Sequence, residues 1–200
     1  METFVLYDKP ECPFCWKIRL ALAEAELPAE IIHYQHGNAE SQWLTLSPNK
    51  TVPVLQHGDV TLYESAIMLE YIADVSGRLL PQTAGEKALP RLLHRYSDMT
   101  LGVGLRKVIF EKRDKPEADW NQQRIAEGTE DFFDALRFLA DTLGDNDYFA
   151  AEYGFAECAL TARLGLAQHY GIAIPEGHAN LRDWFQRMQQ RPSYSLTSPF

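Results

Sequence analysis

The spacing of apolar residues differs between the first and the second part of the chain. In the first part, short apolar runs typical of strands alternate with stretches of helical spacing. The predicted strands cover 4–7, 30–35, 52–56 and 60–63. The predicted helices start near Cys15, at Ser41 and at Glu64, and the middle one is short and weak. This order, β-α-β-α-β-β-α, predicts an α/β unit with a mixed sheet of four strands.

The second part shows helical spacing only, which predicts an all-α bundle. Its expected helices carry Leu89 to Thr100, span 117–143 and 155–168, and carry Leu181 to Met188 with an end before Pro192. Gly102 and Gly104 are expected to weaken or bend the first of these helices. Small and turn-forming residues at 81–87 indicate a linker, so we expect domains at 1–80 and 88–200.

Composition and charge narrow the functional classes. The formal net charge of −9 disfavours binding to the phosphate backbone of nucleic acids. The densest basic stretch, 106–115, is interrupted by Glu111 and Asp114 and indicates a solvated helix face. The chain shows neither a secretory signal nor an apolar run long enough to span a membrane. With only three cysteines, it is not a disulfide scaffold, and we expect a cytoplasmic protein.

The candidate chemistry starts with Cys12 and Cys15. Both lie where the first predicted strand turns into the first helix, and Pro13 fits the first helical turn. Backbone N–H groups at a helix start lower the pKa of a thiol, so Cys12 is the expected nucleophile. Cys15, one turn later, is expected to be less exposed and to act as the resolving thiol.

Two alternatives remain for this pair of cysteines. A zinc half-site would need two further ligands, but Cys158, His33 and His36 lack the spacing of a second pair, so we expect no metal. The other alternative is a pair of unreactive buried thiols, which fits Cys15 better than Cys12. Cys158, on the apolar helix, is interpreted as a small core residue.

Two further elements are candidates for ligand binding. The Val52-Pro53 dipeptide suggests a cis peptide bond, which would leave the Val52 backbone to pair with an extended, peptide-like ligand; a proline at a strand edge is the plainer alternative. Ser65 at a helix start offers a hydroxyl and N–H groups to a carboxylate, and Glu64 would accept from an ammonium. Alone, Glu64-Ser65 would be interpreted as an ordinary N-cap.

Taken together, these elements resemble the cytosolic glutathione transferase superfamily over essentially the whole chain. The resemblance rests on Cys12-Pro13-Phe14-Cys15, Thr51-Val52-Pro53, Glu64-Ser65, Leu79-Leu80-Pro81, the helical second half and its closing stretch at 180–194. It implies a thioredoxin-like first domain, a helical second domain and a homodimer formed by the third helix and the long helix after the linker. It also places Tyr96 and Met99 on the helix that borders the electrophile pocket.

The resemblance also implies how glutathione is held. Cys12 would face the glutathione sulfur, the Val52 backbone would pair with the cysteinyl part, and Pro53 would be cis. Glu64 and Ser65 would hold the γ-glutamyl end, and Lys50 is a candidate for the glycyl carboxylate. Common members place a serine or tyrosine hydroxyl where Cys12 lies here, whereas a cysteine is similar to omega-like, dehydroascorbate-reductase-like and two-domain glutaredoxin-like members.

Two other features, at three positions, also depart from, or compete with, the family pattern. Tyr7 is a rival source of a hydroxyl, but it belongs to the first strand. Gly154 and Glu157 replace the usual Ser or Thr cap and Asp of the central helix, which would weaken the cap by at most a few tenths of a kcal/mol.

Three functions follow as hypotheses. The first is a glutathione-dependent thiol–disulfide oxidoreductase that works through a Cys12–glutathione mixed disulfide, acting on a small-molecule or protein disulfide. The second is a transferase that conjugates glutathione to apolar electrophiles. The third is a binding or regulatory protein without catalysis, because a fold does not imply an activity.

Overall fold

The computed structural model describes residues 2–33 and 43–200. Contacts divide the chain into two compact units, one comprising the residues up to Pro81 with Arg191–Phe200 and the other Gln82–Gln190. The first unit contains β1 (Phe4–Asp8), α1 (Pro13–Glu24), β2 (Ala29–His33), α2 (Trp43–Leu46), β3 (Val54–His57), β4 (Val60–Leu62), α3 (Ser65–Ser76) and α9 (Pro192–Thr197). The second contains α4 (Ala84–Tyr96), η1 (Ser97–Leu101), α5 (Gly102–Asp114), η2 (Glu117–Asp119), α6 (Gln122–Leu143), α7 (Phe155–His169) and α8 (Ala179–Gln189).

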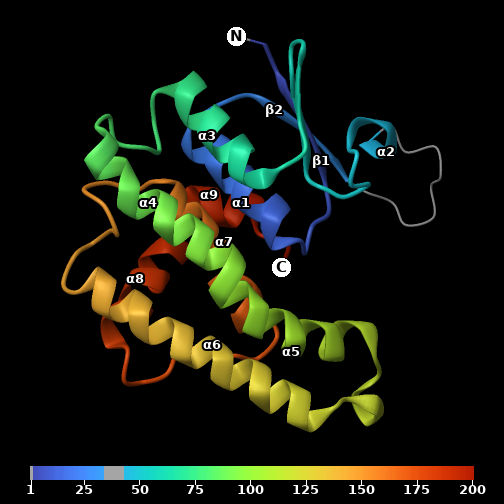
Figure 1. Cartoon of the computed structure of the whole chain (residues 1–200), viewed down its shortest axis with the longest axis vertical. Coiled ribbons are helices and arrows are strands. Elements are labelled where there is room, and N and C mark those ends of the chain that lie inside the picture. Colours follow the sequence, from blue (N-terminus) through green and yellow to red (C-terminus); the bar gives the residue numbers. More distant parts are fainter. Residues whose placement is uncertain (1, 34–42) are drawn as a thin grey trace. The chain divides into compact units, whose positions relative to one another are not determined.

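The sheet of the first unit is mixed, as predicted. Its strand order is β2-β1-β3-β4, in which β1 runs parallel to β2 and antiparallel to β3, and β3 runs antiparallel to β4 (Figure 1). Residues 34 and 35 of the predicted second strand lie outside the described residues. Successive residues of β1 face opposite sides of the sheet. On one side, Tyr7 packs with Val54 and with Trp43 of α2.

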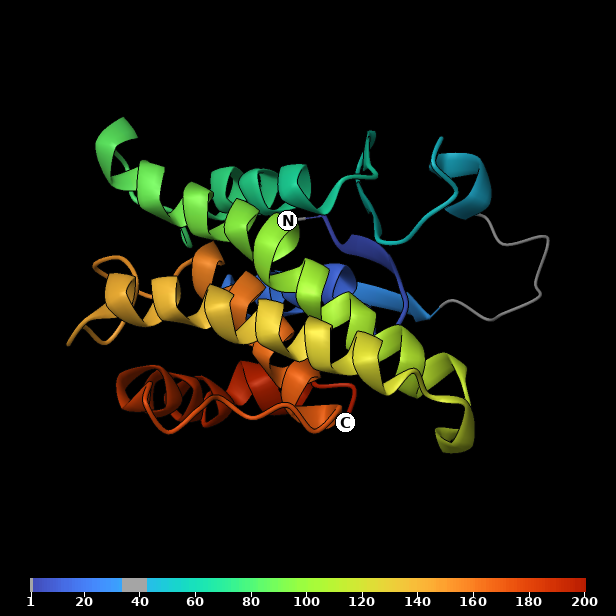
Figure 2. The same ribbon diagram turned by 60° about the horizontal axis from the view of Figure 1, so that its bottom comes forward.

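The second unit is helical throughout its described elements. A single run of helix joins α4, η1 and α5, with a π-helical turn at Ser97–Leu101 (Figure 2). The helix continues through Gly102 and Gly104, which were expected to weaken or bend it, and Gly104 has a packing role. A Cβ atom on Gly104 would lie 2.8 Å from the Gly128 carbonyl oxygen of α6. α5 and α6 thus approach each other closely at these two glycines.

Three predicted boundaries differ from the structure. The helix expected at 117–143 begins at Gln122, because the Asn121 side chain caps it by accepting from the Arg124 N–H at 3.0 Å. The last four residues of the expected linker are helical, because α4 begins at Ala84 behind a capping box of Thr83 and Glu86. By contacts, residues 191–200 belong to the first unit, whereas the sequence placed them with the second.

The start of α7 shows how the unusual Gly154 cap is compensated. The buried carboxylate of Glu157 accepts from the N–H of Gly154 and from the N–H of Phe149, both at 2.8 Å. A longer side chain than the family's aspartate thus binds both the helix start and the preceding loop. Helix α7 is buried on nearly every side, from Phe155 to Ala167, which confirms its predicted central position.

No helix in the described parts of the chain is both long enough and apolar enough for a bilayer crossing.

Candidate functional site

Cys12 lies at the N-terminal end of α1, as predicted. It is the N-cap residue, with extended backbone angles (φ −83°, ψ 118°), and its side chain is partly exposed. Its carbonyl oxygen accepts from the N–H groups of Cys15 at 3.0 Å and Trp16 at 2.8 Å, and its own N–H donates to the Lys9 carbonyl at 3.0 Å. A tight turn between β1 and α1 therefore presents Cys12 at a helix start, where the helix dipole favours negative charge.

Cys15 has the opposite environment. Its side chain is fully buried, and its sulfur accepts from the Lys9 N–H at 3.4 Å. Burial raises the pKa of the Cys15 thiol well above its usual value. A hydrogen bond with the Cys12 side chain and the negative charges of Cys12 and Asp8 raise this pKa further. Cys15 is therefore held as a neutral thiol behind Cys12.

An ion pair lies at the base of this turn. Asp8, fully buried at the end of β1, accepts from Arg19 Nη1 at 2.6 Å with both carboxylate oxygens. His33 Nδ1 lies 3.0 Å from the same carboxylate. Arg19 Nη2 also donates to the Pro10 carbonyl at 2.8 Å. Neither Asp8 nor Arg19 was among the predicted site residues, although Arg19 lies one helical turn after Cys15.

The C-terminal segment contacts the same helix. Trp16 Nε1 donates to Thr197 Oγ1 at 3.1 Å, and the Trp16 ring contacts the rings of Tyr194 and Phe200. Farther along α1, Glu24 accepts from Arg191 Nε at 2.7 Å. Helix α9 therefore lies against α1, and its ring contacts reach the residue next to Cys15.

The second group of predicted residues surrounds the start of β3. The Val52–Pro53 peptide bond is cis, as expected. Val52 precedes β3, and the pairing of β3 with β1 begins only at Val54. Lys50 is exposed and has a positive φ of 52°. The Val52 backbone thus lies beside the paired part of the sheet, not within its β1–β3 ladder.

Glu64 and Ser65 lie at the start of α3, as predicted. Glu64 is the N-cap residue, without a side-chain cap bond, and its exposed carboxylate accepts from Asn49 Nδ2 at 3.2 Å. Ser65 is buried in the first turn of the helix. Asn49 was not predicted, because nothing in its sequence neighbourhood distinguishes it from a turn asparagine. The carboxylate of Glu64 is thus oriented by a neighbouring loop and remains exposed.

The other candidate residues have structural environments. The Tyr7 hydroxyl donates to Gln56 Oε1 at 3.2 Å, and burial, followed by the charge of Glu30, raises the pKa of Tyr7. Cys158 is buried, with its sulfur 3.4 Å from the Tyr153 hydroxyl. His36 lies outside the described residues. Within 2–33 and 43–200, no group of three or more His, Cys, Asp or Glu side chains has the arrangement of a metal site.

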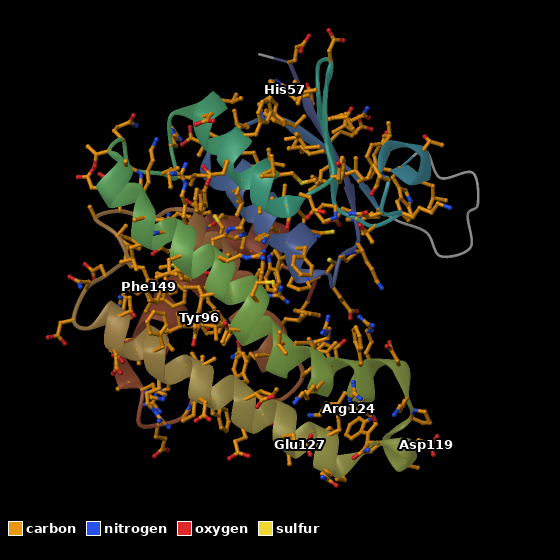
Figure 3. All side chains as sticks on the ribbon, in the orientation of Figure 1. His57, Tyr96, Asp119, Arg124, Glu127 and Phe149 are labelled. Carbon is orange, nitrogen blue, oxygen red and sulfur yellow. The ribbon has the colours of Figure 1, made fainter. Side chains whose placement is uncertain are left out.

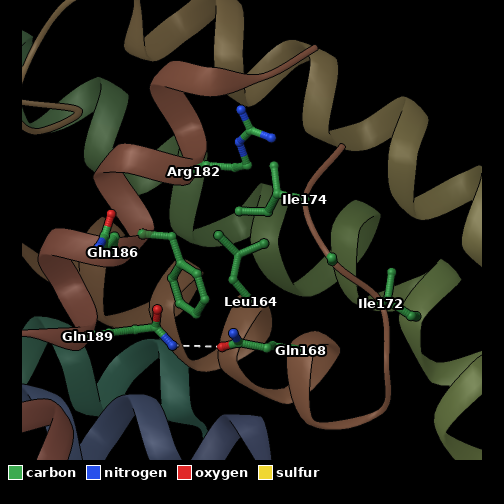
Figure 4. Close-up of a pocket in the computed structure, with 9 residues that line it drawn as sticks. Leu164, Gln168, Ile172, Ile174, Arg182, Gln186 and Gln189 are labelled. Atoms are coloured by element: carbon green, nitrogen blue, oxygen red, sulfur yellow. Dashed lines mark hydrogen bonds between the residues drawn. The ribbon is translucent and has the colours of Figure 1, made fainter. Parts of the chain in front are cut away.

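A hollow of about 320 Å³ lies in the second unit, between α7, α8 and the loop that joins them (Figure 4). Apolar side chains such as Leu164, Ile174 and Phe185 line it, and Arg182 is its charged lining residue. At one end, Gln189 Nε2 donates to Gln168 Oε1 at 2.6 Å. No nucleophile or acid lines this hollow.

A second hollow, of about 410 Å³, lies in the same unit along η1 and α6, and Tyr96, Met99 and Asp134 are among its lining residues. The Tyr96 hydroxyl donates to the Ala135 carbonyl at 3.1 Å, and burial raises the pKa of Tyr96 (Figure 3). Tyr96 therefore ties η1 and α4 to α6, whereas Met99 remains exposed.

Comparison with known families matches both halves of the chain. Residues 2–74 match the family model "Glutathione S-transferase, N-terminal domain", and residues 98–192 match "Glutathione S-transferase, C-terminal domain". A probable glutathione S-transferase parC of Nicotiana tabacum is 32% identical over 99% of this chain and 90% of the relative. Glutathione S-transferase 2 of Saccharomyces cerevisiae is 24% identical over 96% of this chain and 88% of the relative.

Solved structures have the same fold. The theta class glutathione S-transferase from the citrus canker pathogen Xanthomonas axonopodis pv. citri, with glutathione bound, superposes with a TM-score of 0.89. The two proteins are 24% identical, over 98% of this chain and 97% of the other. The four-stranded mixed sheet with a helical second unit is therefore the glutathione transferase architecture, thioredoxin-like in its first domain. By its sequence and its fold, the chain belongs to the glutathione S-transferase family.

Proposed function

We propose that this family member is a glutathione-dependent thiol–disulfide oxidoreductase in which Cys12 is the nucleophile. The observation that carries the proposal is the contrast between the two thiols. Cys12 is partly exposed at a helix start, whereas Cys15 is buried with a raised pKa. A cysteine at this position forms a disulfide with glutathione, which a serine or tyrosine hydroxyl cannot do.

The charges of the predicted binding residues are complementary to glutathione, which carries two carboxylates and one ammonium. The Ser65 hydroxyl and the N-terminal turn of α3 suit the γ-glutamyl carboxylate, and the exposed Glu64 carboxylate suits its ammonium. Lys50 suits the glycyl carboxylate. The Val52 backbone, which precedes the cis bond to Pro53 and lies outside the β1–β3 ladder, suits the peptide part. Glutathione-bound relatives such as the Xanthomonas protein support the same co-substrate.

The reaction proceeds in two exchanges. The Cys12 thiolate attacks the glutathione sulfur of a mixed disulfide, forms the Cys12–glutathione disulfide and releases the substrate as a thiolate, which takes a proton from water. A second glutathione thiolate then cleaves this disulfide, which regenerates the Cys12 thiolate and produces oxidised glutathione. Since Cys15 is buried and protonated, we assign the second step to glutathione and not to Cys15.

Thiol substitutions test this mechanism in an assay that follows reduction of a glutathione mixed disulfide. Cys12→Ser should abolish the reduction, because an alcohol does not form the disulfide intermediate. Cys15→Ser should retain most of it, and the buried Cys158→Ser serves as the matched control. Full activity of Cys12→Ser would disprove the mechanism. Conjugation of an aryl halide, with negligible disulfide reduction by the native protein, would favour the conjugating transferase instead.

We also propose a homodimer, in a cytoplasmic setting where glutathione keeps thiols reduced. Leu92, Met99 and Val103 recur on one face of the α4–η1–α5 run and are 54%, 54% and 40% exposed. An apolar stripe of this kind on a soluble domain is typical of a subunit contact. Light scattering should give twice the chain mass for the native protein and the monomer mass for Met99→Glu. The control substitution Leu196→Glu should leave the mass at twice that of the chain. A monomeric native protein would disprove the dimer.

A further inference from the structure

Arg19 binds three different parts of the first unit with three different nitrogens. Its Nη1 donates to both oxygens of Asp8 at 2.6 Å, and its Nη2 donates to the Pro10 carbonyl at 2.8 Å. Its Nε donates to the Thr197 carbonyl at 3.1 Å. The side chain is only 7% exposed. It therefore joins the end of β1, the thiol turn and the C-terminal segment from a single position on α1.

These bonds hold the backbone that carries the reactive thiol. Asp8 and Pro10 are fixed by Arg19, and between them Lys9 donates its N–H to the Cys15 sulfur at 3.4 Å. The Lys9 carbonyl in turn accepts from the Cys12 N–H. Each residue from Asp8 to Pro10 is thus bonded to α1 or to Cys12, and Arg19 provides the charge-assisted bonds, which are the strong ones.

The planar guanidinium is needed for this arrangement. Its donors point in fixed, diverging directions, so one side chain can serve acceptors on several sides. A lysine ammonium keeps the charge, but all of its N–H donors lie on one nitrogen atom. It therefore cannot bind Asp8, Pro10 and Thr197 at once. The Thr197 carbonyl is held in place because α9 is anchored to Glu24 by Arg191 and Ser193.

We propose that Arg19 is the positioning residue of the Cys12–Cys15 turn and that the C-terminal segment 191–200 acts on the turn through it. Arg19 does not contact the reacting atoms. It keeps Cys15 enclosed and holds the backbone N–H groups at the helix start in the orientation that makes Cys12 reactive at neutral pH. The inference rests on the proposed function only for the identity of the nucleophile.

The three cysteines provide the test, since each reports a different place. The native protein and Arg19→Lys are treated with iodoacetamide over a range of pH, and mass spectrometry follows labelling at Cys12, Cys15 and Cys158. In Arg19→Lys we expect Cys15 to be labelled at least about tenfold faster, because a buried thiol reacts only through local opening. We expect the pH midpoint of Cys12 labelling to rise by about one unit, with Cys158 unchanged.

Two results would overturn the proposal. One is labelling of Cys12 and Cys15 in Arg19→Lys at the same rates as in the native protein. The other is an equal gain at Cys158, which lies in the second unit and would report general unfolding. Arg78→Lys is the matched control and should label like the native protein, because Arg78 forms an exposed ion pair with Glu26 at 2.9 Å.

A second variant tests the C-terminal segment without altering Arg19. Arg191→Gln combined with Ser193→Ala removes the bonds of α9 to Glu24, and we expect a smaller change in the same direction at Cys15. If this double variant is labelled at the rates of the native protein, the proposed role of the segment is wrong. The double variant also keeps the proposal testable if Arg19→Lys does not fold. Labelling needs no glutathione, so failure of the proposed reduction by Cys12 would leave this result standing.

Discussion

At the residue scale, burial is the largest difference between the two thiols of the turn. Cys12 and Cys15 lie within one helical turn, yet Cys12 is partly exposed, whereas Cys15 is fully buried and its sulfur accepts from the Lys9 N–H. Burial disfavours the thiolate, and the nearby charges of Asp8 and Cys12 disfavour it further at Cys15. As the pH rises, Cys12 therefore loses its proton before Cys15 does. This order of deprotonation is the one that a nucleophile with a protonated neighbour requires.

Tyr7 gives a prediction that separates thiol from hydroxyl chemistry. Its hydroxyl donates to Gln56 within the sheet, and burial raises its pKa, so it is poorly suited to stabilise a glutathione thiolate. We expect Tyr7→Phe to keep disulfide reduction within about twofold of the native rate, at a cost of about 1 kcal/mol in stability for the lost hydrogen bond. A loss of activity comparable to that of Cys12→Ser would show that the hydroxyl takes part.

Glu111 gives a pH-dependent prediction. Hydrogen bonds from Lys115 and from the Asn121 N–H, with the charges of Lys115 and Arg124, hold the pKa of Glu111 below its usual 4.5. Arg124 lies near the N-terminal end of α6 (Figure 3). A lowered pKa in the folded state stabilises the fold above the unfolded-state pKa, and this stabilisation is lost as the pH falls through the folded-state pKa.

We therefore expect Glu111→Gln to lower the free energy of urea unfolding at neutral pH, and the difference from the native protein to shrink below pH 4.5. The control Glu176→Gln, in an exposed loop, should unfold like the native protein throughout. A difference between Glu111→Gln and the native protein that stays constant down to strongly acidic pH would contradict the assignment.

At the element scale, the paired glycines explain how α5 and α6 pack. A Cβ on Gly128 would lie 2.7 Å from the Gly104 carbonyl oxygen, and a Cβ on Gly104 would meet the α6 backbone in the same way. Residues without a Cβ let two helix backbones approach this closely. From the sequence, Gly102 and Gly104 were expected only to weaken or bend their helix, because helix propensity describes an isolated helix and not its neighbour.

Gly104→Ala should therefore destabilise the protein, although alanine is the better helix former. We expect a loss of roughly 1–3 kcal/mol in the free energy of unfolding, because backbone atoms of α6 must move to make room. Gly85→Ala is the matched control: it lies in the first turn of α4 with no atom within 4 Å of its added Cβ, so it should be neutral or slightly stabilising. Equal effects of both substitutions would contradict the close approach.

At the scale of the whole molecule, local patterns and long-range contacts were not equally predictable. Period and turn residues predicted the order of strands and helices, the two-part organisation and the position of Cys12, since these depend on neighbours in sequence. The link from Arg19 to Thr197 joins residues 178 positions apart, and no local pattern indicates such a contact. The contacts of α1 with the C-terminal segment are all of this kind.

The closing segment completes the first unit, so its removal should be costly for that unit. In a chain that ends at Gln190, Trp16 loses the hydrogen bond of Thr197 and the ring contacts of Tyr194 and Phe200. Because exposing a large buried side chain costs about 1.5–3 kcal/mol, and the ion pair with Glu24 is lost as well, we expect a loss of roughly 3–5 kcal/mol in the free energy of unfolding.

Tryptophan fluorescence reports the place of this loss. The emission of the truncated chain should shift to longer wavelength in the folded state, and the shift should disappear when Trp16→Phe is the background. Trp184, buried in α8 of the second unit, should stay unchanged and provides the internal reference. If the truncated chain unfolded at the native denaturant concentration, residues 191–200 would be an appendage and not a part of the first unit, and their proposed action on the Cys12 turn would fall with it.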